Sequence, residues 1–161
     1  MTKLNLMGKG HSDELYTPDY AVEVISKYLS KDSMLFECAV GTGKIVKSLE
    51  KRGFRVLSSN DFFNETRNGF DIIISNPPYS KKDDFIKKCY EIGKPFALLL
   101  PINAFEGLKR QALYKQYGIQ VLLPNKRIDF NGKGSPWFYT AWFCWKLLPK
   151  DIMFCDIKKK G

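Results

Sequence analysis

The sequence contains few residues of the kinds that build metal centres and disulfide frameworks. Its 161 residues include one histidine, His11, and four cysteines, no two of which have Cys-x-x-Cys spacing. A zinc site is therefore not expected, and the cysteines are expected to be buried thiols in a reducing compartment. No signal peptide and no apolar run of about 18 residues are present. We therefore expect a cytoplasmic protein with no membrane partner.

The chain also lacks internal repeats, low-complexity linkers and the length for two full domains. We expect an N-terminal arm over 1–15, one domain over 16–150 and a basic tail over 151–161. Acidic residues are the minority charge, 17 against 26 lysines and arginines, which gives a net charge of +9. This excess favours a polyanionic partner, because basic side chains contact phosphates and release counterions.

Helix-like and strand-like apolar segments alternate along the chain, which predicts an α/β fold with a largely parallel sheet. The first helix is expected to begin at Thr17-Pro18-Asp19, with Thr17 as its N-cap. The last strands are expected to form an antiparallel hairpin around the turn-rich segment 131–136. Expected strands cover 34–38, 55–59, 71–75, 96–100, 119–123 with 126–130, and 137–147, with a further short strand around 61–63.

The residues Asn76-Pro77-Pro78-Tyr79 directly follow the apolar strand expected at 71–75. Ligands of open α/β sheets bind at this carboxyl edge. The Asn76 side-chain oxygen and a backbone carbonyl of the two prolines can accept both hydrogens of an exocyclic amine, and Tyr79 can stack on a planar ring. The tetrapeptide therefore predicts a site for a planar group that carries an amine.

The segment Ser75-Asn76-Pro77-Pro78-Tyr79-Ser80 resembles the catalytic motif of S-adenosylmethionine-dependent amino-methyltransferases, above all small phage and bacterial enzymes that methylate N6 of adenine in DNA. Two upstream segments follow the order of that class: Tyr16-Thr17-Pro18, then Phe36-Glu37-Cys38-Ala39-x-Gly41-x-Gly43. The resemblance implies S-adenosylmethionine as the cofactor and a Rossmann-like class I methyltransferase fold with a mostly parallel seven-stranded sheet. No Pro-Cys dipeptide is present, which argues against a cytosine-C5 enzyme.

The resemblance also implies roles for individual residues. It assigns catalysis to Asn76, Pro77, Pro78 and Tyr79, and cofactor binding to Tyr16, Thr17, Pro18, Glu37, Ala39, Gly41, Gly43, Asp61 and Phe62. Glu37 is expected near the ammonium or the sulfonium of the cofactor. The ribose-binding acid and the Asp-Phe motif of the family are compressed here into 58–63. Asp61 is therefore expected to contact either the ribose or the adenine, with Asn60 or Ser59 near the ribose in the second case.

A basic and aromatic segment late in the chain is the candidate nucleic-acid contact, formed by Lys126, Arg127, Lys133 and Trp137. A solvated basic loop explains its charges nearly as well. The alternating rings from Trp137 to Trp145 fit a central strand that packs on both faces. Alternatively, their Trp137–Phe138 end supports a flipped base.

Three functions agree with these features. The first is N6-adenine methylation of DNA. The second is the same chemistry on an RNA base or on a glutamine amide of a protein, and the third is nucleic-acid binding by a module with a weak cofactor site. No stretch is long enough for a separate target-recognition domain. Sequence specificity would then come from short loops or from a protein partner, or would be low.

Overall fold

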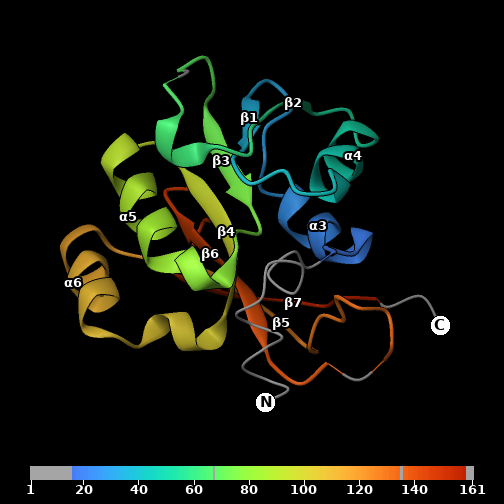
Figure 1. Cartoon of the computed structure of the whole chain (residues 1–161). Helices are drawn as coiled ribbons and strands as arrows, with labels where there is room; N and C mark the ends of the chain where they lie inside the picture. Colours follow the sequence, from blue (N-terminus) through green and yellow to red (C-terminus); the bar gives the residue numbers. More distant parts are fainter. Residues whose placement is uncertain (1–15, 67, 135, 159–161) are drawn as a thin grey trace.

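The computed structural model describes residues 16–66, 68–134 and 136–158, and helices and strands alternate along most of this part of the chain (Figure 1). The strands are β1 (Met34–Glu37), β2 (Arg55–Ser58), β3 (Ile72–Ser75), β4 (Phe96–Pro101), β5 (Gln120–Pro124), β6 (Thr140–Trp145) and β7 (Ile152–Cys155). The helices are α3 (Asp19–Ser26), α4 (Lys44–Glu50), α5 (Lys82–Ile92) and α6 (Leu108–Tyr117), with 3₁₀ helices η1 (Phe62–Asn64), η2 (Tyr79–Lys81) and η3 (Ile102–Phe105). None of the described helices combines the length and the apolar character needed to span a bilayer.

The seven strands form one sheet in the order β2-β1-β3-β4-β6-β5-β7. β6 lies antiparallel to its neighbours β4 and β5, and all other neighbouring strands are parallel. The mostly parallel sheet and the antiparallel pair of β5 and β6 are therefore confirmed. The order reverses at β1, which has β2 on one side and β3 on the other. Ligands of such sheets bind beside the carboxyl ends of the strands at this reversal.

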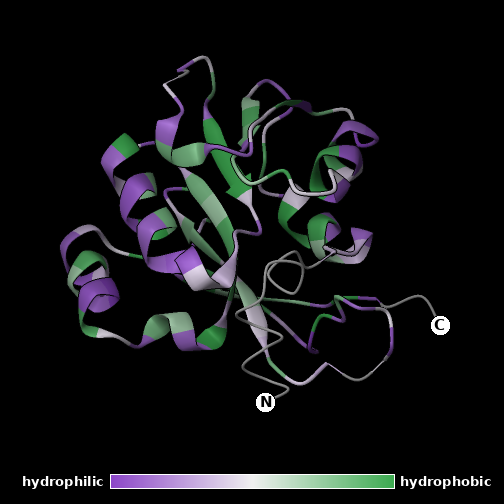
Figure 2. Cartoon of the chain, viewed as in Figure 1, coloured by the Kyte–Doolittle hydropathy of each residue, from purple (hydrophilic) through white to green (hydrophobic). Residues whose placement is uncertain are grey.

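Two apolar layers hold the helices on opposite faces of the sheet. On one face α3 and α4 pack onto alternate strand residues such as Leu35, Ile74 and Leu99. On the other face α5 packs onto residues of the opposite parity, such as Ile73 and Leu98, and α6 lies beside α5. The central strands are buried on both sides, which is why their sequences are continuous apolar runs. Figure 2 shows the hydrophobic strands between helices whose outer faces are largely hydrophilic.

Residues 140–145 of the late aromatic segment form the central strand β6, as one of its two interpretations predicts, whereas Trp137 and Phe138 precede this strand. All residues of β6 are buried. Trp142 lies in the layer of α3, and its indole nitrogen donates a hydrogen bond to the Ala21 carbonyl at 2.9 Å. Phe143 and Trp145 lie in the layer of α5. The rings of residues 141–145 are therefore core residues on both faces of the sheet.

Two expected strands are wrong. Residues 62–64 form η1, because the Asn64 amide bonds back to the Asp61 carbonyl at 3.2 Å instead of to a neighbouring strand. The segment 126–130 has the side-chain alternation of a strand, with Ile128 buried in the core. The segment is nevertheless not a strand, and its Asp129 amide donates a hydrogen bond to the Tyr20 hydroxyl at 2.9 Å.

The boundary expected for the C-terminal tail is also wrong. Residues 152–155 form β7, which pairs in parallel with β5 at the edge of the sheet. Ile152 and Phe154 are exposed and Met153 and Cys155 are half-buried, so β7 buries only one face. Such a short half-buried strand gives a weak sequence signal beside charged residues. The expected arm 1–15 and the last residues of the tail, 159–161, lie outside the described residues.

Candidate active site

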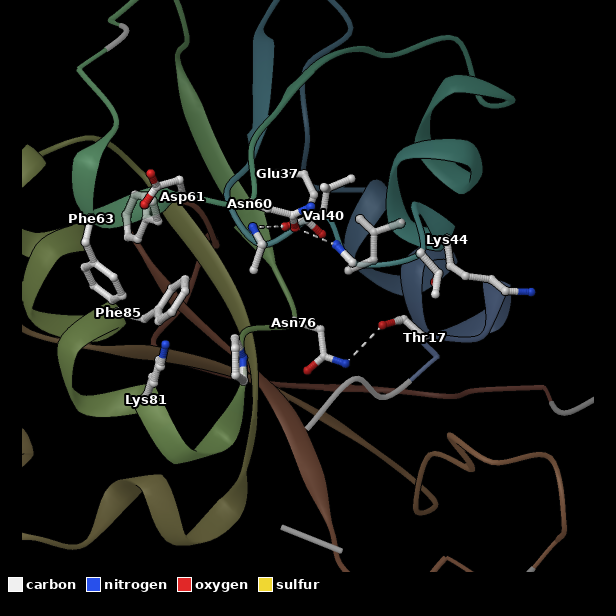
Figure 3. Close-up of a pocket in the computed structure, with 16 residues that line it drawn as sticks. Thr17, Glu37, Val40, Lys44, Asn60, Asp61, Phe63, Asn76, Lys81 and Phe85 are labelled. Atoms are coloured by element: carbon white, nitrogen blue, oxygen red, sulfur yellow. Dashed lines mark hydrogen bonds between the residues drawn. The ribbon is translucent and has the colours of Figure 1, made fainter. Parts of the chain in front are cut away.

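A pocket of about 340 Å³ opens at the carboxyl ends of β1 and β3, where the strand order reverses (Figure 3). Its volume lies within the range of about 300–1,000 Å³ that is usual for ligand pockets. The walls come from the segment before α3, the β1–α4 loop, the residues after β2, and the segment from Asn76 into α5. Eight residues of the predicted site line it: Thr17, Glu37, Ala39, Gly41, Asp61, Phe62, Asn76 and Pro78.

The β1–α4 loop brings its backbone to the edge of the pocket. Gly41 has φ of 53°, a left-handed conformation that favours glycine. Its amide donates to the side-chain oxygen of Asn60 at 3.0 Å, and the Val40 amide donates to the Ser59 carbonyl at 3.1 Å. The glycine loop is thereby attached to the residues that follow β2, and both sides of this corner form one structural unit.

Glu37 ends β1 with a side chain that is buried in the wall of the pocket, at 1% exposure. Its Oε1 accepts a hydrogen bond from the Ala39 amide at 2.9 Å. Burial raises the pKa of Glu37 to about 8, and the neighbouring Ser75 and the Ala39 amide oppose this rise only in part. A cationic group of a ligand would favour the ionised carboxylate and would be attracted by it.

The side chain of Asn76 is held in one orientation directly after β3. Its Nδ2 donates to the Thr17 hydroxyl at 3.0 Å (Figure 3), whereas its buried Oδ1 has no hydrogen-bond partner in the described part of the chain. The expectation that Thr17 is the N-cap of α3 is wrong, because Pro18 occupies that position. A buried acceptor left unpaired costs about 1–3 kcal/mol, so such groups are rare. The Asn76 oxygen suits a ligand that supplies the missing donor.

Aromatic rings and a carboxylate form another part of the pocket (Figure 3). Phe63 and Phe85 meet edge to face with their centroids 4.9 Å apart, and Phe62 stacks on Phe85 at 5.2 Å. The Asp61 carboxylate accepts hydrogen bonds from Asn64 Nδ2 at 3.0 and 3.2 Å, which fix its position. Ring faces beside an acceptor suit a flat heteroaromatic group that carries an amine.

Tyr79 is buried in the fold and does not line the pocket. Its ring meets Phe138 edge to face with the centroids 6.0 Å apart. Its hydroxyl has no hydrogen-bond partner among the residues described, and burial raises the pKa of this phenol. The chain then turns into η2, where the Pro78 carbonyl accepts a hydrogen bond from the Lys81 amide at 3.0 Å.

Other residues of the predicted site lie beside the pocket or away from it. Tyr16 and Pro18 line a neighbouring groove, to which Thr17 also belongs. Gly43 is the N-cap of α4, with φ of 81°, and Pro77 is buried; neither of them lines the pocket. The predicted nucleic-acid residues are exposed between β5 and β6, outside the pocket: Lys126, Arg127, Lys133 and Trp137.

The sequence interpretation missed several side chains of the pocket, among them Phe63, Lys81 and Phe85. Lys81 follows the Asn-Pro-Pro-Tyr segment closely, and this closeness in the sequence could have predicted its place in the pocket. Phe85 belongs to the apolar face of α5, where a core position is the natural expectation. Only the fold shows that α5 begins beside the pocket and brings the Phe85 ring to its wall.

Comparisons with known proteins agree with this geometry. The profile of the Eco57I restriction-modification methylases matches residues 1–118. No curated protein gives a significant match. A proposed class I S-adenosylmethionine-dependent methyltransferase from Listeria monocytogenes has a TM-score of 0.60 at 15% identity, over 98% of this chain and 71% of that one.

Two further solved structures share the fold at 15% identity. One is a dimethyladenosine transferase from Plasmodium falciparum, with a TM-score of 0.51 over 84% of this chain and 63% of that chain. The other is a modification subunit of a proposed type I restriction enzyme from Vibrio vulnificus YJ016, with a TM-score of 0.54. That match covers 98% of this chain, which spans only 49% of the subunit.

These likenesses establish a class I methyltransferase fold, with its mostly parallel seven-stranded sheet. The pocket fits S-adenosylmethionine, which is cationic at one end and carries an adenine at the other. Glu37 is a buried carboxyl group for the cationic end, and Phe63, Phe85 and Asp61 can hold a heteroaromatic ring. The profile match covers well over half of the chain. The chain therefore belongs to the Eco57I restriction-modification methylase family, and its cofactor is S-adenosylmethionine.

Proposed function

We propose that the protein transfers a methyl group from S-adenosylmethionine to the exocyclic N6 amine of adenine in DNA. One observation carries this proposal: the buried Oδ1 of Asn76 has no partner among the described residues, while Thr17 binds Nδ2 of the same side chain. An amide oxygen accepts hydrogens and donates none. It therefore suits a nucleophile that has hydrogens to donate, as an amine does.

The adenine amine is a poor nucleophile because its nitrogen lone pair is delocalised into the ring. Asn76 Oδ1 would accept one hydrogen of this amine. A backbone carbonyl of the Pro77-Pro78 segment would accept the other. These two acceptors would draw the nitrogen toward a tetrahedral geometry and direct its lone pair at the methyl group. Bound S-adenosylmethionine supplies an electrophilic methyl group on sulfur, so positioning and fixed dipoles account for most of the expected rate.

We assign the cofactor's two ends to two parts of the pocket. Glu37 and the Gly41 loop would hold the methionine part, because an ionised Glu37 attracts the cationic groups there. Asp61 and the rings beside it would hold the adenine, with the carboxylate accepting a hydrogen from its amine. This assignment favours adenine over ribose as the contact of Asp61. Asn60, which is tied to the Gly41 amide, would then lie near the ribose.

The target base would stack on Tyr79 after leaving the duplex. Flipping a base costs a few kcal/mol, and stacking on an aromatic ring offsets part of this cost. Because Phe138 contacts the Tyr79 ring edge to face, a base that stacks there requires the Phe138 side chain to move. Tyr79 and Phe138 would then enclose the base together, and Trp137 would support it from the neighbouring position.

DNA is the favoured substrate because the family consists of restriction-modification methylases and the chain carries a net charge of +9. Lys126, Arg127 and Lys133 are exposed on one loop and would contact phosphates. One solved structure that shares the fold is a modification subunit of a proposed type I restriction enzyme. By analogy with a subunit of an assembly, we propose that a partner protein supplies recognition of the target sequence.

The test is direct measurement of the product. The protein is incubated with S-adenosylmethionine and mixed-sequence DNA or RNA, and methylated nucleosides are quantified by mass spectrometry after digestion. N6-methyladenine in DNA that disappears with Asn76→Ala would support the proposal. A methylated base in RNA alone would keep the chemistry and replace the substrate. No product in either nucleic acid would favour a glutamine amide as the acceptor, or a binding module that does not turn over.

A further inference from the structure

A second groove, of about 630 Å³, lies beside the active-site pocket. One of its walls is α4 with its C-cap, where Lys44, Lys47 and Lys51 recur at spacings of three and four residues and share one face. The other walls are the loop 129–132 and the segment 16–19. All three lysines line the groove and are exposed.

The acidic residues of this groove already bind other groups of the protein. Asp19 forms ion pairs with Arg52 at 2.7 Å and with Lys51 at 3.0 Å. The hydrogen bond from Arg52 is the main reason that the pKa of Asp19 lies well below its usual range. The Asp129 carboxylate accepts two backbone amides of the loop that follows it. The lining holds three lysines and two aspartates, so its net charge is positive, and Lys51 is already paired with Asp19.

The groove adjoins the proposed active site and shares two of its lining residues. Thr17 and Lys44 line both cavities, and the Thr17 hydroxyl binds the Asn76 side chain. A polymer that lies in the groove would therefore be separated from the Asn76 amide by the Thr17 side chain. The loop that forms the far wall is followed directly by Lys133, which is exposed but does not line the groove.

We propose that the groove between α4 and the loop 129–132 binds the phosphodiester backbone of the substrate DNA beside the target adenine, with Lys44 and Lys47 as phosphate contacts. This inference rests on the proposed function, because it takes DNA as the substrate. It adds a surface on α4 to the late basic loop that the sequence pattern indicates. Lysine contacts to phosphates position the duplex without reading its sequence. They therefore agree with a chain that leaves sequence recognition to a partner.

The salt dependence of DNA binding tests this surface. Affinity of the full chain for a fluorescein-labelled duplex is measured by anisotropy between about 50 and 200 mM NaCl. Each lost phosphate contact lowers the slope of log K against log salt by about 0.9, so Lys44→Gln with Lys47→Gln should lower it by about 1.8. Lys109→Gln with Lys115→Gln is the matched control, since both lysines are exposed on α6, on the opposite face of the sheet.

A lower slope for the α4 variant and a wild-type slope for the α6 variant would support the groove. Equal slopes for both variants would overturn it, whether both fall or neither does, and so would the absence of DNA binding by the wild type. Methyl transfer is measured separately on the same samples. A wild type that binds DNA through α4 but yields no methylated base contradicts the proposed function and leaves the groove in place. Methylated DNA from a variant with an unchanged slope contradicts the groove alone.

Discussion

The side-chain nitrogen of Asn76 lies 3.0 Å from the hydroxyl oxygen of Thr17, although 59 residues separate them along the chain. A half turn of an asparagine amide exchanges its nitrogen and its oxygen, and in the structure the nitrogen is the atom on the Thr17 side. With Nδ2 bound to Thr17, Oδ1 is left to accept a hydrogen. The segment before α3 thus orients the proposed catalytic group in addition to lining the cofactor pocket.

Thr17→Val removes this hydroxyl and keeps the shape of the side chain. We expect kcat to fall about tenfold, the equivalent of about 1.4 kcal/mol, because the Asn76 amide loses the hydrogen bond that fixes its orientation. Thr17→Ser keeps the hydroxyl and should keep most of the turnover. Equal losses in the two variants, measured by steady-state methylation, would show that the hydroxyl does not orient Asn76.

Asn76→Ala should reduce methyl transfer by about 100-fold or more, because it removes an acceptor aimed at the reacting amine. The affinity for S-adenosylmethionine, measured by calorimetry, should change little. Asn103→Ala is a suitable control, since Asn103 is exposed in η3 and does not line the pocket. Loss of cofactor binding on the same scale as loss of turnover would contradict the role assigned to Asn76.

Binding of S-adenosylmethionine should release a proton near neutral pH. The pKa of Glu37 is about 8, so its carboxyl group is mostly protonated at pH 7, while a cationic ligand favours the ionised form. Affinity should therefore rise with pH and level off above about pH 8. Calorimetry in buffers of different ionisation enthalpy counts the released proton. Glu37→Gln should abolish the release, and a release that survives this substitution would have to come from another group.

The same carboxyl group should make the fold less stable at high pH. Its pKa rises from an ordinary 4.5 to about 8 on folding, so between these values the folded chain binds the extra proton. The stabilisation is fully present below about pH 4.5 and is lost as pH rises to about 8, by at most about 1.4 kcal/mol per unit. Glu37→Gln should flatten this dependence in urea unfolding at a series of pH values. An unchanged wild-type slope in the variant would exclude Glu37 as its source.

Tyr79→Phe should stabilise the protein by about 1 kcal/mol, because the buried hydroxyl has no hydrogen-bond partner among the described residues. The ring is retained, so methyl transfer should be retained as well. Tyr90→Phe gives the opposite comparison, since the Tyr90 hydroxyl donates to the Gly118 carbonyl at 2.6 Å and its loss should destabilise the fold. Urea unfolding measures the change in stability of each variant, which should be an increase for Tyr79→Phe and a decrease for Tyr90→Phe. A Tyr79→Phe variant that loses turnover without losing stability would give the hydroxyl a role in the reaction.

The central strands could be predicted because each is a continuous apolar run that is buried on both faces, a pattern that permits few other structures. β3, for example, differs from its expected range by a single residue. The segment 126–130 could not be assigned correctly, because its side chains alternate as in a strand while its backbone binds a side chain instead of a neighbouring strand. The Tyr20 hydroxyl that binds the Asp129 amide is 109 residues away, and no local pattern reports such a contact.

The candidate site was partly predictable for a similar reason. The glycine loop and Asn76 directly follow strands, so the sheet itself brings them to one edge. Phe85 could not be distinguished from a core residue of α5. Thr17 was misassigned as a helix cap because its hydroxyl suits capping and side-chain hydrogen bonding equally well, and only the position of Asn76 decides between them.

The short segment from Asn76 to Phe85 carries both the amine acceptor and a ring of the cofactor wall, with η2 between them. Any substitution that tilts α5 moves these two groups together. Turnover and cofactor affinity should therefore vary in parallel across a library of α5 variants. Natural or laboratory selection for tighter cofactor retention through this helix would at the same time reshape the geometry around the substrate amine.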